Sequence, residues 1–219
     1  MKEKSDISPN LADLRREYLQ AKLVETEVAK DPIHQLTIWL NDAIRAEVPE
    51  PNAMALATST FEGKPSVRMV LLKDLSSEGL VFFTSYESKK ARHLLQNPYA
   101  ALTLYWSDLE RQVRVEGVVR KIPAEQSDSY FEIRPERSKL GAWASPQSSV
   151  VPSRRYIEQL VKDFEEEFEG KTVVRPENWG GYVVEPSLVE FWQGREDRLH
   201  DRIQYRKDND RWVIERLAP

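Results

Sequence analysis

Apolar and polar positions alternate with a period of two over most of the chain beyond residue 53, and this pattern predicts β-strands. Nine alternating or short apolar segments predict roughly eight strands, since neighbouring segments can belong to one strand. These segments are 53–59, 65–73, 79–85, 100–106, 111–122, 180–186, 188–193, 201–207 and 211–217. Within 111–122 the alternation breaks at Gly117, which predicts a β-bulge at that residue.

An apolar period near 3.6 predicts helices in five segments that lie before or between the predicted strands. These segments are 11–23, 33–44, 88–98, 124–133 and 153–170. Asp31-Pro32 is a start signal for the second helix, and Ser88 is a suitable N-cap for the third. Because strands and helices do not alternate as βαβ units, we expect a mainly β (α+β) fold, an antiparallel barrel with peripheral helices. We also expect a disordered tail over 1–10 and a single domain over 11–219.

The composition of the chain excludes several classes of function. The chain has 219 residues, a net charge of −4 and no cysteine. The acidic balance gives no general attraction to nucleic acid, and the lack of cysteine excludes disulfides and thiolate chemistry. Three separated histidines argue against a metal site. The N-terminal MKEKSDISPN lacks the apolar stretch of a signal peptide, and no apolar run reaches the ~18 residues of a membrane span. We therefore expect a cytoplasmic protein without a membrane or nucleic-acid partner.

Two pairs of cations lie at the ends of predicted elements. Arg68 and Lys73 flank the apolar run Met69–Leu72, whose composition predicts a strand buried on both faces. These cations could clamp an anion at the barrel rim, or they could simply be solvated. Lys89 and Lys90 fall in the first turn of a helix, where the macrodipole disfavours cations. A bound anion would remove that conflict, and a solvated helix start is the alternative.

A third group shares a four-residue spacing. Tyr130, Arg134 and Ser138 would lie on one helix face, but Pro135 interrupts the helix. The three side chains are therefore expected to converge from two helices that meet at a corner. A phenol, a guanidinium and a hydroxyl are suitable donors for a phosphate monoester, and an exposed helix face is the alternative.

The segment FWQGREDRLHDR places two aromatics before a dense group of charges. If a strand begins at Arg198, then Arg198, His200 and Arg202 face one side and Leu199 packs on the other. Three cationic or nearly cationic groups in a row repel one another unless something anionic or electron-rich lies across them. A surface strand with alternating charge is the alternative. From the residues alone, we expect an antiparallel barrel that binds phosphorylated small molecules, and they lead no further.

Motifs that follow one order along the chain resemble the pyridoxine/pyridoxamine 5′-phosphate oxidase family. They are LRREY (14–18), RMVLLK, SKKA, LERQVRVEG, IRPERSKLGAWAS-QSS, FWQG, RLHDR and the terminal RLAP, so the similarity covers nearly the whole chain. The resemblance implies a split β-barrel that binds FMN, and a homodimer with active sites at the subunit interface. It also implies oxidation of pyridoxamine or pyridoxine 5′-phosphate to pyridoxal 5′-phosphate. Oxygen would accept the electrons and give H2O2, with ammonia released from the amine.

The resemblance implies roles for individual positions. Those at FMN are Arg68, Met69, Val70, Leu71, Leu72, Lys73, Phe83, Thr84, Lys89, Lys90, Gln112, Gln147, Ser148, Trp192 and Arg202, with Arg68 and Lys90 at its phosphate. Those at the substrate are Lys73, Tyr130, Arg134, Ser138, Arg198, Leu199 and His200, together with Arg15, Arg16, Glu17 and Tyr18 of a possible lid helix over 11–24. Arg198 and His200 are implied as the catalytic residues. The family often has tyrosine at position 83 and arginine at position 89, so Phe83 and Lys89 are departures; Lys89 keeps the charge but not the bidentate fork.

Two other functions are compatible with parts of this pattern. A related split-barrel flavin reductase that uses nicotinamide or a deazaflavin would act on another substrate, and it would not need a second phosphate site. A non-catalytic protein that holds FMN or pyridoxal phosphate is the other alternative, although all the matched positions are chemically competent. A flavin spectrum and oxygen consumption with pyridoxamine 5′-phosphate separate the three functions.

Overall fold

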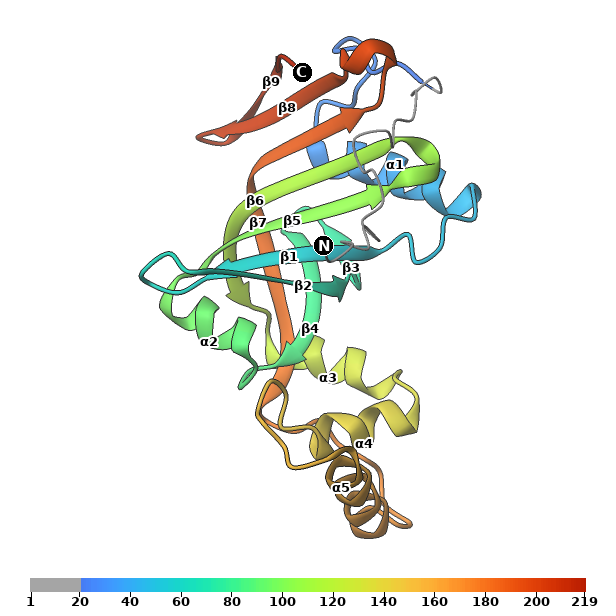
Figure 1. Ribbon diagram of the computed structural model, residues 1–219, viewed down its shortest axis with the longest axis vertical. Coiled ribbons are helices and arrows are strands. Elements are labelled where there is room, and N and C mark those ends of the chain that lie inside the picture. The colour runs from blue at the N-terminus through green and yellow to red at the C-terminus, as the bar shows by residue number, and fades with distance from the viewer. Residues whose placement is uncertain (1–20) are drawn as a thin grey trace, which may run out of the picture.

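The computed structural model describes residues 21–219, which form one curled antiparallel sheet with helices around it (Figure 1). The strands are β1 (Ala53–Ser59), β2 (Pro65–Leu71), β3 (Asp74–Ser76), β4 (Gly79–Ser85), β5 (Tyr99–Trp106), β6 (Arg111–Lys121), β7 (Trp179–Gln193), β8 (Asp201–Asp208) and β9 (Arg211–Arg216). The α-helices are α1 (Pro32–Arg45), α2 (Lys89–Gln96), α3 (Ala124–Glu132), α4 (Glu136–Ala144) and α5 (Arg154–Glu167). The predicted mainly β architecture with peripheral helices is confirmed.

Strand β7 organises the sheet because it pairs with different strands along its length. The order is β2-β1-β5-β6-β7-β4-β3, and β8 and β9 extend the sheet from β7. The first part of β7 pairs with β4 and its last part pairs with β8, while β6 runs beside both parts. The β6–β7 register shifts between Glu116 and Gly117, which confirms the predicted bulge. The sheet therefore divides near the middle of β7, and the two strands predicted for 180–186 and 188–193 are one continuous strand.

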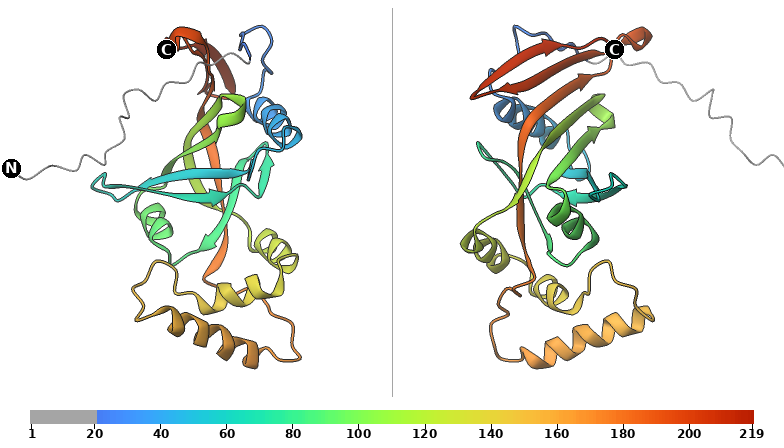
Figure 2. Two further views of the ribbon diagram at one scale, coloured as in Figure 1. Left: turned by 45° about the vertical axis from the view of Figure 1, so that its right-hand side comes forward. Right: turned by 90° about the vertical axis from the view of Figure 1, so that its left-hand side faces the viewer.

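The sheet curls into a half-barrel because the chain after β2 returns to β4. The backbone N–H of Lys73 donates to the carbonyl oxygen of Val81 (2.9 Å), and β3 pairs with β4 immediately afterwards. The inner face of this curl carries the core, in which Leu56, Phe82 and Val115 are fully buried. The views in Figure 2 show α1 against the part of the sheet near β8 and β9, and α3 to α5 grouped at the opposite end.

Helices α1 and α2 begin at the capping residues predicted from the sequence. Asp31 accepts a hydrogen bond from the backbone N–H of His34 at the start of α1, and Ser88 accepts one from Ala91 at the start of α2. Both predicted caps are confirmed. Of the helix predicted for 11–23, only residues 21–23 are described, and they are not helical. Over residues 21–219 no helix is both long enough and apolar enough to cross a membrane.

Strand β2 corrects one prediction. The run Met69–Leu72 was expected to be buried on both faces, but Val67, Met69 and Leu71 are 67%, 64% and 37% exposed. The physical reason is that β2 alternates between an inner and an outer face, and no described element covers the outer face that carries these three residues. Leu72, just beyond the strand, is buried in the core, and Val70 is partly buried against it.

The bulge at Gly117 leads to a prediction about stability. A Cβ at this position would lie 2.0 Å from the carbonyl oxygen of Glu185 on β7, so the β6–β7 pairing would have to shift. We expect Gly117→Ala to lower the free energy of unfolding by about 3 kcal/mol, measured by chemical denaturation. The control is Gly141→Ala in α4, where a Cβ meets no atom within 4 Å and stability should be equal or slightly higher. Equal stability of Gly117→Ala and the unmodified chain would contradict the prediction.

Candidate functional site

A cavity of about 490 Å³ lies between strands β2 and β4 and helices α2, α3 and α4. It is lined by Arg68, Met69, Val70, Leu71, Lys73, Phe83, Thr84, Lys90, Tyr130, Arg134, Pro135, Ser138, Gln147 and Trp179. Apart from Pro135 and Trp179, every lining residue belongs to the sets predicted from the sequence. A larger open groove of about 850 Å³ runs along α5, but none of the predicted site residues line it. The smaller cavity is therefore the candidate site.

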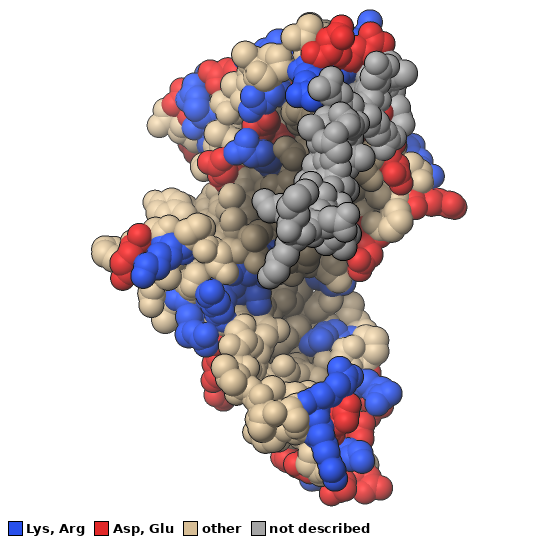
Figure 3. Space-filling view, in the orientation of Figure 1, with Lys and Arg blue, Asp and Glu red and all other residues tan. Residues whose placement is uncertain are grey.

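The cavity carries positive charge without a balancing carboxylate. Its described lining includes no Asp or Glu but has four cations: Arg68, Lys73, Lys90 and Arg134. In Figure 3, Lys and Arg side chains gather near α2, next to this end of the sheet. Buried cations that lack acidic partners are costly unless an anion binds among them. The cavity is therefore suited to an anionic ligand.

Lys90 is the most deeply buried of these cations. Its Nζ donates to Thr84 Oγ1 (2.9 Å) and to Gln147 Oε1 (2.8 Å), both of which are neutral. Burial, with a smaller contribution from the charge of Arg68, lowers the pKa of Lys90 to about 8. A bound anion would restore the charged form, so Lys90 and Arg68 mark one anion-binding end of the cavity.

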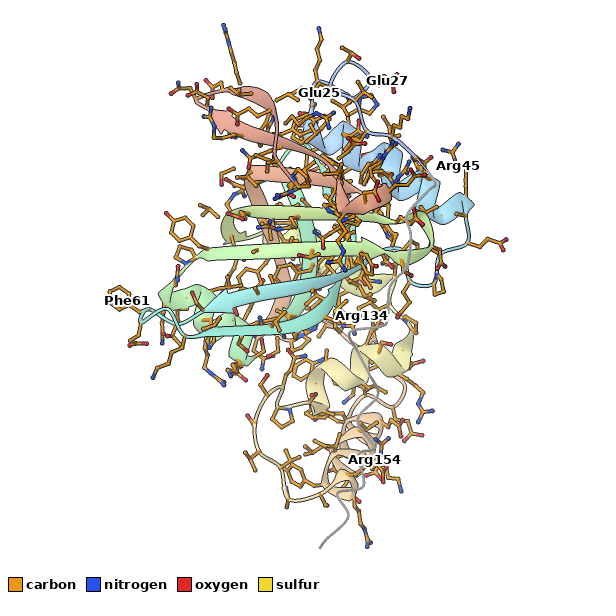
Figure 4. The ribbon with its side chains drawn as sticks, turned by 45° about the horizontal axis from the view of Figure 1, so that its top comes forward. Glu25, Glu27, Arg45, Phe61, Arg134 and Arg154 are labelled. Atoms are coloured by element: carbon orange, nitrogen blue, oxygen red, sulfur yellow. The ribbon has the colours of Figure 1, made fainter. Side chains whose placement is uncertain are left out.

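Arg134 marks a second anion-binding end. Helix α3 ends and α4 begins at the corner around Pro135, so Tyr130 and Ser138 face the cavity from two helices, as the sequence predicts. The guanidinium of Arg134 lies 4.4 Å from the ring centroid of Trp179, and burial lowers its pKa. Its Nη1 is buried and has no hydrogen-bond partner among the described residues (labelled in Figure 4). A phosphate in the cavity would satisfy this unpaired donor.

An aromatic stack lies beside Arg134. The ring of Phe83 lies 3.9 Å from that of Tyr130 at an interplanar angle of 17°, and 5.4 Å from that of Trp179 at 12°. The phenylalanine at position 83 therefore contributes a ring face that orients Tyr130, and this contact needs no hydroxyl group.

Three predicted flavin positions lie beside the cavity and do not line it. Lys89 is exposed on the first turn of α2. Ser148 follows Gln147 in a left-handed conformation (φ 71°), with its side chain exposed. Leu72 is buried in the core.

A second group of predicted residues lies at the other end of the sheet. Gln112, Trp192 and Arg202 are direct cross-strand neighbours on β6, β7 and β8. Trp179 and Trp192 lie near opposite ends of β7, which has 15 residues and is therefore roughly 50 Å long (Figure 1). Within one chain, the second group is therefore far from the cavity.

The turn before β8 corrects another prediction. The strand expected to begin at Arg198 begins at Asp201, after a 3₁₀ turn over Glu196–Arg198. Asp197 and Arg198 have φ angles of 54° and 62°, which are incompatible with an extended strand. As a result Arg198 does not share a strand face with His200 and Arg202. Leu199, which was expected to pack on the opposite side, is 67% exposed.

The position of the proton on His200 follows from a backbone contact. Its Nδ1 accepts a hydrogen bond from the backbone N–H of Arg195 (3.1 Å), so the neutral ring carries its proton on Nε2. Burial, followed by the charge of Arg198, lowers the pKa of His200 and favours this neutral form. The ring centroid lies 4.7 Å from that of Trp192. Arg195 was not predicted as a site residue, because a backbone donor leaves no mark in a side-chain pattern.

Arg202 is oriented by a buried carboxylate. Glu190 is 3% exposed and accepts from Nε of Arg202 (2.8 Å) and from Nη1 of Arg114 (3.0 Å). Nη1 of Arg202 also donates to the carbonyl oxygen of Ala218 near the C-terminus (2.7 Å). These contacts hold the guanidinium in one orientation on the outer face of the sheet.

The remaining predicted residues belong to the N-terminal segment. Arg15, Arg16, Glu17 and Tyr18, with most of the possible lid helix over 11–24, lie outside the described residues. Within the part of the chain that is described, no three His, Cys, Asp or Glu side chains gather as a metal site would require.

Two family models match the chain. Residues 40–167 match the model described as pyridoxamine 5′-phosphate oxidase. Residues 179–219 match the model described as the pyridoxine 5′-phosphate oxidase C-terminal dimerisation region. The first match contains most of the cavity lining, and the second contains Trp192, Arg198, His200 and Arg202.

Curated relatives are similar in sequence to this chain over nearly its full length. The chain is 50% identical over 210 residues to the pyridoxine/pyridoxamine 5′-phosphate oxidase of Cyanothece sp., which covers 96% of this chain and 99% of that protein. It is 52% identical over 212 residues to the enzyme of the same name from Salinibacter ruber, with 95% and 99% covered.

Solved structures share the fold. PhzG of Burkholderia lata, crystallised with tetrahydrophenazine-1-carboxylic acid, has a TM-score of 0.86 at 30% identity, covering 91% of this chain and 99% of PhzG. A pyridoxamine 5′-phosphate oxidase-related, FMN-binding protein of Nostoc punctiforme has a TM-score of 0.68 at 17% identity, with 88% and 100% covered.

Proposed function

The chain belongs to the pyridoxamine 5′-phosphate oxidase family, and on this basis we propose that it oxidises pyridoxamine or pyridoxine 5′-phosphate to pyridoxal 5′-phosphate with FMN as cofactor. The observation that carries the proposal is a single cavity with two anion-binding ends and no carboxylate among its described lining residues. Oxygen is the electron acceptor and yields H2O2, and the amine substrate also releases ammonia. The cysteine-free chain suits the reducing cytoplasm, where we propose that the enzyme works.

The end of the cavity formed by β2, β4 and α2 fits the phosphate of FMN. Arg68 and Lys90 supply charge there, and burial lowers the pKa of both groups, with a further contribution at Lys90 from the charge of Arg68. When bound, FMN supplies the two-electron acceptor for the C4′ carbon of the substrate and returns the electrons to oxygen. The other proposed flavin contacts of this chain are Met69, Val70, Leu71, Leu72, Lys73, Phe83, Thr84, Lys89, Gln147 and Ser148.

The other end of the cavity fits the substrate phosphate. The unpaired Nη1 of Arg134 supports this assignment most directly, because a phosphate oxygen would satisfy it. Tyr130 and Ser138 add hydroxyl donors, and Lys73 adds a second cation at the end of β2. Two phosphate sites in one cavity that is also lined by aromatic rings suit a phosphorylated pyridine stacked on a phosphorylated flavin.

We further propose a homodimer in which each active site combines residues of both chains. Three observations support it: the length of β7, the exposed apolar residues of β2, and the match of 179–219 to a dimerisation region. A two-fold axis would bring the far end of one β7 to the cavity of the other chain. The partner's Gln112, Trp192 and Arg202 would then contact the flavin. The partner's Arg198 and His200 would hold the substrate ring, with Leu199 beside them.

The function is tested by purifying the protein, recording its absorption spectrum and measuring oxygen uptake with pyridoxamine 5′-phosphate. A yellow protein that consumes oxygen only when the substrate is added is the expected result. A colourless protein that neither binds added FMN nor consumes oxygen would overturn the proposal. A flavoprotein that reduces another substrate and ignores pyridoxamine 5′-phosphate would favour the reductase alternative.

The shared site is tested by mixing two variants that are each nearly inactive at a substrate concentration near the KM of the unmodified protein. A heterodimer of Arg134→Leu and Arg198→Ala chains has one site with both substitutions and one site with neither. Random association after joint refolding is therefore expected to restore about one quarter of full activity. Activity no higher than that of the separate variants would show that both residues act within one chain.

The lowered pKa of Lys90 predicts a pH-dependent flavin affinity. As pH rises through about 8, the free protein loses the Lys90 proton, whereas a bound phosphate favours keeping it. The Kd of the apoprotein for FMN should therefore rise above pH 8, by up to about tenfold per pH unit, as measured by quenching of flavin fluorescence. Lys90→Met should bind more weakly at neutral pH and lose this dependence. Arg92→Met, which removes an exposed cation of the same helix, should retain it. A constant Kd between about pH 7 and 9 in the unmodified protein would contradict the prediction.

A further inference from the structure

His93 is a buried ionisable residue outside the cavity lining. It lies on α2 one turn after Lys90 and is 7% exposed. Its Nδ1 is 3.3 Å from Oγ1 of Thr58 on β1, a side chain that is itself only 3% exposed. Thr58 Oγ1 in turn receives Nη1 of Arg68 at 2.8 Å. A hydrogen-bonded chain thus runs from α2 through β1 to the arginine proposed at the flavin phosphate.

The direction of these hydrogen bonds follows from the chemistry of the groups. Arginine can only donate, so Thr58 Oγ1 accepts from Arg68. The hydroxyl proton of Thr58 is then directed to Nδ1 of His93, the other partner that the described residues offer it. His93 is therefore the acceptor and carries its own proton on Nε2. Without this acceptor, the hydroxyl proton would be buried and unpaired, and the threonine would be free to rotate away from Arg68.

The hydrogen bonds from His93 through Thr58 fix the guanidinium of Arg68. Its Nη1 donates to Thr58 and also to the carbonyl oxygen of Leu56 (2.9 Å), so both contacts hold the same nitrogen and leave Nε and Nη2 for a ligand. Lys90 is on the same helix as His93, so the contact with Thr58 also sets the position of one cation relative to the other. Two cations on different elements bind one phosphate well only when their separation is fixed.

We infer that Thr58 and His93 are positioning residues that hold Arg68 and Lys90 in the geometry required to bind the flavin phosphate. The inference rests on the proposed function, because it takes Arg68 and Lys90 as phosphate ligands. It assigns to His93 an effect on the phosphate group alone and none on the isoalloxazine ring.

The experiment compares the binding of FMN and of riboflavin, which lacks the phosphate, to the apoprotein by quenching of flavin fluorescence. Thr58→Val and His93→Leu are expected to raise the Kd for FMN about tenfold, because each removes an arrangement that supports a charged hydrogen bond. The Kd for riboflavin should stay within about twofold, since its binding does not use the phosphate contacts. A general structural defect would weaken both ligands equally.

Conservative variants and a matched control complete the test. Thr58→Ser keeps the hydroxyl, and His93→Asn places a carboxamide oxygen near the position of Nδ1, so both should retain FMN affinity. Ser59→Ala is the control, because it removes another α2–β1 contact, that of Asn97 Nδ2 with Ser59 Oγ (2.8 Å), which does not reach Arg68. If Thr58→Val does not fold, His93→Leu and His93→Asn decide the question.

The outcomes distinguish failure of the proposed phosphate site from failure of the role assigned to Thr58 and His93. An unmodified chain that binds riboflavin as tightly as FMN would overturn the assignment of the phosphate site, and this inference with it. A preference for FMN that survives both Thr58→Val and His93→Leu would overturn this inference alone. Equal weakening of FMN and riboflavin would also overturn it.

Discussion

Replacing Arg134 with leucine is expected to raise the KM for pyridoxamine 5′-phosphate about 100- to 1000-fold while FMN remains bound. Arg134 is half-buried, lies over Trp179 and has an unpaired buried Nη1, so we propose that it makes a charged, bidentate contact with the substrate phosphate. Two charge-assisted hydrogen bonds at about 1.5–2 kcal/mol each, the lower part of their usual range, account for the size of the effect. Initial rates of oxygen uptake against substrate concentration measure it, and the flavin absorbance shows whether the cofactor is retained.

The control for this variant is Arg137→Leu. Arg137 is one turn further along, on α4, and is exposed, so its removal changes the net charge equally without touching the cavity. We expect its KM to stay within about twofold of the unmodified value, as is usual for surface substitutions. A similar rise in KM for both variants would point to long-range charge, and an unchanged KM in Arg134→Leu would remove this residue from the substrate site.

Substitution of Arg198 or His200 by alanine is expected to lower kcat about 100-fold with FMN still bound. The neutral His200 offers an N–H donor at Nε2, fixed by the backbone of Arg195, and Arg198 extends from a left-handed turn beside it. Together they would hold the substrate ring so that its C4′ carbon meets the flavin, and loss of such orientation reduces the rate of the chemical step. Single-turnover reduction of the flavin under anaerobic conditions measures this step directly.

The exposed Glu196 in the same turn provides the matched control. Glu196→Ala removes a charge within the Glu196–Arg198 turn but no proposed substrate contact, so kcat should be nearly unchanged. If all three variants retain normal single-turnover rates, the substrate face has been assigned to the wrong residues. If Glu196→Ala is as slow as the others, the conformation of the turn, and not the two side chains, governs the rate.

Local rules were sufficient to predict the elements whose signals lie within a few residues. Asp31 and Ser88 cap α1 and α2 because a short polar side chain next to an apolar period satisfies free backbone N–H groups. The bulge occurs at Gly117 because only glycine, which has no Cβ, fits the close approach to the neighbouring strand there. Pro135 produces the corner that brings Tyr130 and Ser138 together, and this corner could be inferred from proline geometry alone.

Longer-range features could not be predicted from the sequence. The apolar run in β2 was expected to be buried on both faces, yet Met69 is exposed because no described element covers the outer face of β2. The alternation around Arg198 suggested a strand, but two left-handed residues make a turn whose cause is not visible in the hydrophobic pattern.

In the candidate site, too, the residues that depend on long-range contacts could not be predicted from the sequence. Trp179 lines the cavity although it is far from the other lining residues in sequence, and Thr58 and His93 matter only through contacts between α2 and β1. The N-terminal lid and the division into a tail and one domain stay predictions.

The length of β7 links cofactor binding to the association of the chains. In the proposed dimer, the 15-residue β7 begins at one cavity and would end near the partner's, so a separated chain would keep only part of the flavin contacts. By mass action, FMN would then stabilise the dimer, and dilution of the protein would release flavin and activity together. Excess free FMN would delay this loss, so the stored enzyme should tolerate dilution only as far as its cofactor concentration allows.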